Sequence, residues 1–166
     1  MPVSRRDFNE VFLGAMALPG FAEWLNAEPR DSKPAFFSPE DFEALESFTA
    51  ILIPTDQTPG AREARCAQFI DFLLNASAED PKMQAGWRNA MSTLRDLGYH
   101  SSGPEAREKL VEQMAGQQHP TFLFIKQLNT FAFYTSRAGQ IQTLDYRGNS
   151  YNATFPACTH PEHKVI

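Results

Sequence analysis

The sequence lacks the short motifs that bind common cofactors and nucleotides. It contains no GxGxxG turn, no Walker loop and no CxxCH haem-attachment motif. Ser47, Ser77 and Ser92 lie in predicted helical segments, without the strand-to-helix turn that exposes a nucleophilic serine. His100 and His119 stand alone at predicted helix boundaries, where caps and surface groups are commoner than catalytic bases. We therefore predict no catalytic site from these residues.

The chain also lacks a basic patch and a long apolar run. Its formal net charge is −5, and no stripe of lysine and arginine is present, so nucleic acid is not an expected partner. No segment offers the roughly 20 apolar residues that span a bilayer. Phenylalanine, in contrast, is abundant, with 14 among 166 residues. This is more apolar aromatic surface than a small single domain needs for its own core.

The N-terminus resembles a twin-arginine export signal. Arg5 and Arg6 form the arginine pair, Phe8 follows, and residues 11–18 make a short apolar run. Such a segment is an address read by a receptor, not a membrane anchor. This route carries proteins that have already folded, often around a cofactor. Because the chain has no cofactor motif of its own, this signal indicates that the cofactor belongs to a partner.

The alternative for the N-terminus is an ordinary amphipathic helix that happens to carry two arginines. Asp7, Asn9 and Glu10 favour it, because the start of a signal prefers positive charge. Under the export interpretation, a cleavage site is expected after Ala27. Either way, residues 1–27 are set apart as the signal segment, and residues 28–37 are predicted to be a linker.

Residues 38–166 are predicted to form one small all-α domain of about five helices with an irregular C-terminal tail. Apolar residues recur at helical spacing, and prolines and capping residues punctuate them. Ser38 is expected to cap the first helix, and Pro54 to end it. From Gly139 onward the periodicity fades. The five helices are expected at residues 39–53, 66–74, 81–97, 104–115 and 121–135.

The helix at 121–135 is apolar around most of its circumference. Such a helix either lies at the centre of a core or is covered by another protein. Both alternatives stay open, and we predict that the helix serves the core and a partner interface together. The residues assigned to that interface are Phe122, Phe124, Phe131, Phe133 and Tyr134, joined by His160 and His163 of the tail.

The two cysteines are predicted to form a disulfide. Cys66 lies on the apolar face of its predicted helix, and Cys158 lies in the tail. An exported chain meets an oxidising compartment, where disulfides persist. Closing this long loop would contribute about 4 to 5 kcal/mol, less any strain. Asp71, on the polar face of the same helix, is expected to be solvated or paired with an arginine such as Arg65.

The end of the chain gathers groups that can bind metals. Cys158, His160, Glu162 and His163 are all metal-ligand types. Ligands confined to six residues rarely close a tetrahedral site without a distant group, and Pro161 stiffens the loop. We therefore predict no metal site here, and histidines that are exposed or contact a partner. A metal or haem-edge contact remains the alternative.

In their order, several short motifs resemble the gluconate 2-dehydrogenase subunit 3 family, the small gamma subunits of flavin-dependent membrane-bound sugar dehydrogenases. The resemblance covers nearly the whole chain. It rests on the motifs at residues 4–6, 52–56, 59–61, 69–71, 133–136, 146–149 and 158–163.

The resemblance implies a non-catalytic subunit with no cofactor of its own. Its large partner would be an FAD-dependent dehydrogenase of the glucose-methanol-choline type, and a cytochrome c subunit carrying haem c would pass electrons on. The small subunit would be needed for folding and stability of the flavoprotein and for its export by the twin-arginine translocase. The expected location is the periplasm, with the complex itself as the link to the membrane. The alternative is a free-standing exported helical protein or enzyme that binds metal through Cys158, His160 and His163.

Overall fold

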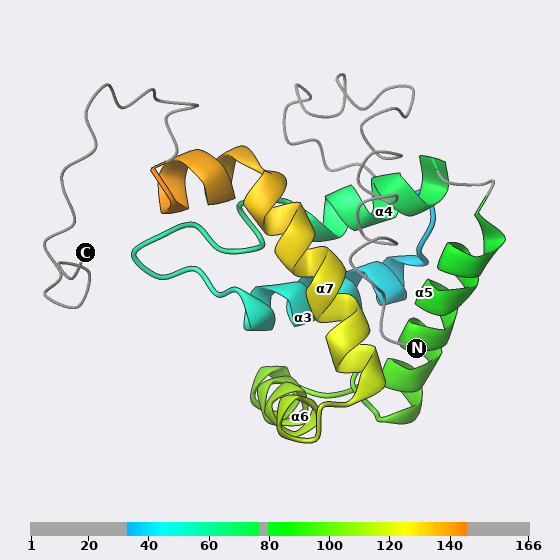
Figure 1. Ribbon diagram of the computed structural model, residues 1–166. Helices are drawn as coiled ribbons and strands as arrows, with labels where there is room; N and C mark the ends of the chain where they lie inside the picture. Colours follow the sequence, from blue (N-terminus) through cyan, green and yellow to red (C-terminus); the bar gives the residue numbers. More distant parts are fainter. Residues whose placement is uncertain (1–32, 77–79, 146–166) are drawn as a thin grey trace, which may run out of the picture.

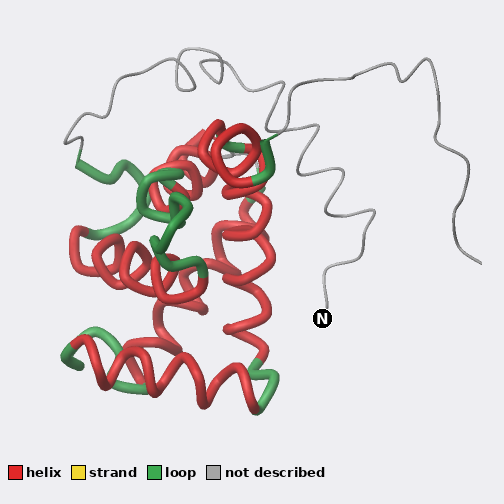
Figure 2. Tube along the Cα trace, turned by 90° about the vertical axis from the view of Figure 1, so that its left-hand side faces the viewer, coloured by secondary structure: helices red, strands yellow, loops and turns green. Residues whose placement is uncertain are grey.

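The computed structural model describes residues 33–76 and 80–145 of the chain. This part is all-α, as the sequence predicts, and contains no strand. Five α-helices are followed by a short π-helix (Figures 1 and 2). No helix in these residues is both long enough and apolar enough to cross a membrane. The elements are α3 (Pro39–Leu52), α4 (Cys66–Ala76), α5 (Pro81–Asp96), α6 (Pro104–Gly116), α7 (Pro120–Thr135) and η1 (Ala138–Thr143).

Four of the helices begin with a proline at the first helical position, which explains why their starts could be read from the sequence. Three of these starts are also capped by a side chain. The Ser38 hydroxyl accepts from the Asp41 amide at 3.1 Å, the Asp80 carboxylate accepts from two amides of α5, and His119 Nδ1 accepts from the Thr121 amide at 3.2 Å. Each cap satisfies amides that have no partner within the helix.

Helix α7 is the centre of the fold. It packs against α3, α4, α5 and α6, and Figure 1 shows it crossing in front of α3 and α4 with α6 at its lower end. Aromatic rings mark these contacts. The Phe122 ring lies 6.4 Å from that of Phe48 on α3, and the Trp87 ring on α5 lies 5.0 Å from that of Phe124. The apolar circumference of α7 therefore reflects its four helical neighbours.

The prediction that Asp71 is solvated or paired with an arginine is wrong. Its side chain is buried rather than solvated, and its carboxylate accepts three backbone hydrogen bonds. The amide of Ala35 donates to Oδ2 at 2.8 Å, and the amides of Phe36 and Phe37 donate to Oδ1 at 3.0 Å each. A carboxylate held by several amides is a stable way to bury a charge. Asp71 thus fastens the end of the predicted linker to α4.

A second difference concerns residues 138–143, where the sequence predicts the start of an irregular tail. The structure has the π-helix η1 there, next to the end of α7. The backbone approaches closely, because a Cβ at Gly139 would overlap the carbonyl oxygen of Phe133. Only glycine permits this contact. The rest of the predicted tail, residues 146–166, lies outside the described residues.

We expect replacement of Asp71 by asparagine to destabilise the fold by about 1–3 kcal/mol, because an amide group would turn a donor towards backbone donors. Urea unfolding should measure the loss. Hydrogen exchange should show faster exchange at the amides of residues 35–37. Asp96→Asn is the matched control, since Asp96 is exposed at the end of α5. Equal stability of the two variants would contradict a role for Asp71 in fastening this segment.

Candidate functional site

The loop between α3 and α4 is held in shape by its own side chains. Glu63 accepts from the Thr55 hydroxyl at 2.6 Å and from the Gly60 amide at 3.0 Å. The hydrogen bond from Thr55 is the main cause that lowers the pKa of Glu63. A Cβ at Gly60 would lie 2.6 Å from the carbonyl oxygen of Ile53, so this turn requires glycine. Glu63 and Gly60 therefore hold the loop in a defined conformation, which a loop that recognises a partner needs.

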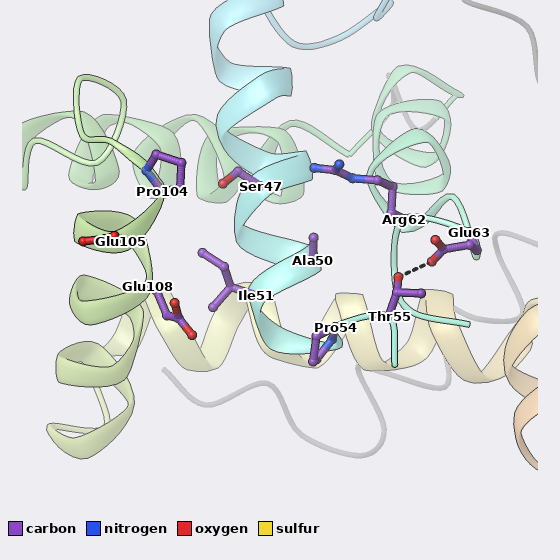
Figure 3. Close-up of a pocket in the computed structure, with 10 residues that line it drawn as sticks. All are labelled: Ser47, Ala50, Ile51, Pro54, Thr55, Arg62, Glu63, Pro104, Glu105 and Glu108. Carbon is purple, nitrogen blue, oxygen red and sulfur yellow. Dashed lines mark hydrogen bonds between the residues drawn. The ribbon is translucent and has the colours of Figure 1, made fainter. Parts of the chain in front are cut away.

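A groove of about 520 Å³ lies between this loop and helix α6, with α3 between them (Figure 3). The loop contributes Arg62 and Glu63, and α6 contributes Glu105 and Glu108. The lining contains neither histidine nor cysteine, so it offers no imidazole base and no thiolate. The Ser47 hydroxyl in the groove accepts a hydrogen bond from Tyr99 at 3.2 Å. The complete lining is Ser47, Ala50, Ile51, Pro54, Thr55, Arg62, Glu63, Pro104, Glu105 and Glu108.

His100 is neither a helix cap nor a surface group. Its Nε2 lies 2.8 Å from the Asp41 carboxylate, which Arg95 also contacts at 2.6 Å. Arg107 donates to the carbonyl oxygen of His100 at 2.9 Å. These contacts join the start of α3 to the segment between α5 and α6. The carboxylate, imidazole and guanidinium groups thus connect elements, and no serine, cysteine or threonine of the described residues forms a hydrogen bond with this imidazole.

The Cys66 thiol is fully buried at the start of α4, as the apolar face predicts. Burial raises its pKa from the ordinary value of 9.0 to about 12. Because the thiolate is the reactive form, this cysteine is inert at neutral pH. Its predicted bond to Cys158 lies outside the described residues and stays a prediction.

The predicted interface residues of α7 occupy different environments. Phe122, Phe131 and Phe133 belong to the core, with 7%, 8% and 2% of their surface exposed. Phe124 is half-buried and packs on Trp87. Tyr134, by contrast, is 46% exposed. The predicted place of this helix in the core is confirmed. The partner interface stays a prediction, and the part of α7 that it could use is the side that no described helix covers.

On that open side the sequence analysis missed Leu123, which is 47% exposed. Leu123 and Tyr134 are eleven positions apart and share a helix face. Between them lies a groove of about 600 Å³, and its lining also includes Lys126, Gln127 and Thr130. The signal was present in the spacing of Leu123, Gln127, Thr130 and Tyr134. It could not be distinguished while every face of the helix looked apolar.

Several predicted functional residues lie outside the described residues. These are the export residues Arg5, Arg6 and Phe8, and the tail residues Cys158, His160 and His163. Within residues 33–76 and 80–145, no group of three or more histidine, cysteine, aspartate or glutamate side chains is placed to hold a metal ion. The described part has a groove beside the α3–α4 loop and another on α7.

Comparison with known proteins gives one match. The family model of gluconate 2-dehydrogenase subunit 3 matches residues 39–151. The matched range starts at the first residue of α3 and includes every described helix. No curated protein and no solved structure matches the chain.

We expect the stability of the reduced protein to fall as the pH rises above 9. Below pH 9 the Cys66 thiol is protonated whether the chain is folded or unfolded. Between pH 9 and about 12, only the unfolded chain releases the proton, with a slope of up to about 1.4 kcal/mol per pH unit. Urea unfolding with reductant at several pH values, on a Cys158→Ala background, should show this slope. Adding Cys66→Ala should flatten it, and an unchanged slope would contradict the burial of the thiol.

Proposed function

The chain belongs to the gluconate 2-dehydrogenase subunit 3 family, and from this membership we propose that it is the non-catalytic small subunit of an FAD-dependent sugar or alcohol dehydrogenase. The carrying observation is the match over residues 39–151, which includes the whole described helical core. In this proposal FAD belongs to a large subunit of the glucose-methanol-choline type. A cytochrome c subunit with haem c takes the electrons onward.

The arrangement of polar groups supports a binding role rather than a catalytic one. Asp71 is engaged by three backbone amides, and His100 and Arg95 are engaged by Asp41. Glu63 shapes the α3–α4 loop. These groups hold the fold together, while the surfaces left open are a groove beside that loop and a face of α7.

We further propose that this subunit escorts the flavoprotein into the periplasm. The arginine pair and the apolar run at residues 11–18 supply the address for the twin-arginine translocase. The segment that follows joins the fold at residues 35–37, where Asp71 fastens the backbone to α4. A signal connected to a folded, partner-bound domain would take the partner along. The flavoprotein then needs no signal of its own.

Changing Arg5 and Arg6 together to lysine tests this escort function. Lysine keeps the charge but loses the planar guanidinium donors. We expect the double variant to fold and to bind the flavoprotein normally, while both subunits stay in the cytoplasm. Cell fractionation, with immunoblots for both subunits, measures the distribution.

The control replaces Arg88 with lysine, because Arg88 is an exposed arginine of the folded domain and lies outside both grooves. This control should leave export unchanged. Normal amounts of flavoprotein in the periplasm of cells that carry the signal variant would refute the escort function. Failure of the wild-type chain to copurify with a yellow flavoprotein would refute the subunit function itself.

The oxidising periplasm also carries the disulfide proposal. We expect peptide mapping of the exported protein without reductant to recover Cys66 and Cys158 in one linked pair. Protein retained in the cytoplasm by the lysine pair should contain both thiols. Recovery of two thiols from the periplasmic protein would sink this proposal.

A further inference from the structure

Exposed apolar side chains gather at one end of the described chain. Five large hydrophobic side chains are exposed among the described residues, and four of them lie on α7, on η1 or directly after η1. Leu123 and Tyr134 lie on α7, whereas Ile141 and Leu144, which are 50% and 59% exposed, lie on η1 and at its end. Leu123 and Tyr134 line one groove, and contiguous apolar surface of this kind marks an interaction site more often than scattered single residues do. We call these four residues, with Lys126 and Arg137, the α7–η1 face.

The charge of this face differs from that of the rest of the chain. The sequence has 20 acidic residues and a net charge of −5, yet no aspartate or glutamate occurs between Glu112 and Asp145. The stretch does contain Lys126 and Arg137, which are both exposed. Lys126 lies 5.7 Å from the centre of the Phe122 ring. Within the described residues neither cation forms a salt bridge. The face is therefore apolar and cationic on an acidic protein.

The groove of about 600 Å³ on α7 gives this face a concave centre. Leu123 and Tyr134 line it together with Lys126 and Phe131. Buried aromatic and aliphatic anchors in such hollows supply most of the affinity of protein interfaces. Charges around the rim add specificity and faster association rather than affinity.

Charge argues against two of the candidates that could cover the face, a second copy of the chain and residues 146–166. A symmetric pairing of two copies would place the same patch on both sides, so Lys126 and Arg137 would meet like charges. Residues 146–166 carry Arg147 and Lys164 against a single acid, Glu162, and give the face no net negative charge. The complementary surface is an apolar one with carboxylates around it.

We propose that the α7–η1 face is the docking surface for the large flavoprotein subunit, which places an apolar side chain in the α7 groove and carboxylates beside Lys126 and Arg137. This assignment rests on the proposed subunit function and specifies where that subunit binds. It narrows the aromatic interface expected from the sequence. The anchors are Leu123 and Tyr134, while Phe122, Phe131 and Phe133 serve the core behind them.

The test measures binding of the purified FAD-containing subunit to the full-length chain. Leu123→Ser with Tyr134→Ser removes the apolar anchors, and we expect the dissociation constant to rise by about tenfold or more. Lys126→Glu with Arg137→Glu should raise it as well and should remove its dependence on salt. The matched controls are Leu97→Ser, the fifth exposed hydrophobic residue at 43%, and Lys109→Glu on α6. Both controls should bind like the wild type.

Two results would overturn the assignment. The first is wild-type affinity in the serine pair, and the second is an equal loss in Leu97→Ser. In the first case, a changed property of the isolated chain would identify what covers the face instead. A shift from dimer to monomer would then assign the face to a second copy, and faster tryptic cleavage after Arg30 would assign it to residues 1–32. If the wild-type chain itself does not bind the flavoprotein, the proposed function fails, not merely the choice of surface.

Discussion

The described fold depends on α7 having neighbours on nearly every side. The helices α3, α4, α5 and α6 all contact it, so its sequence must supply apolar side chains in several directions at once. Phe122 meets α3, Phe124 meets α5 and Phe131 meets Phe69 of α4. One stripe of apolar residues would satisfy only one of these contacts. A single central helix thus joins the four other described α-helices into one core.

Buried polar side chains fix positions that the apolar contacts of α7 leave undetermined. Asp71 turns the segment at residues 35–37 onto α4, where Phe37 reaches Trp87 with ring centres 6.0 Å apart. Asn129 is fully buried on α7 and donates to the carbonyl oxygen of Thr49 on α3 at 3.3 Å. Such bonds have directional requirements that apolar contacts lack. They fix the position of α7 against α3 and the place where the N-terminal segment joins the core.

The sequence predicted the helix starts, because these depend on residues that are close together in the chain. Prolines at first helical positions located four helix starts, and Ser38 was correctly expected to cap the first helix, because these signals act within one turn. Asp71 was misplaced because the amides that bind it lie 34–36 residues earlier, in a segment without periodicity. The exposure of Leu123 could not be derived either. Which side of an apolar helix stays open depends on how four other helices pack.

Helix α7 packs into the core on most sides and exposes apolar side chains on the remaining one. Replacing Leu123 and Tyr134 by polar residues would remove little from the core, since both are nearly half exposed. Their apolar character is therefore not explained by stability. The absence of acidic residues between Glu112 and Asp145 is not explained by helix formation, because glutamate is a good helix former. Both features leave exposed apolar side chains on α7 and η1, and cations that form no salt bridge within the described residues, as the proposed docking surface requires. A core helix suits a binding surface because the four helices packed against it hold its open face in a fixed orientation.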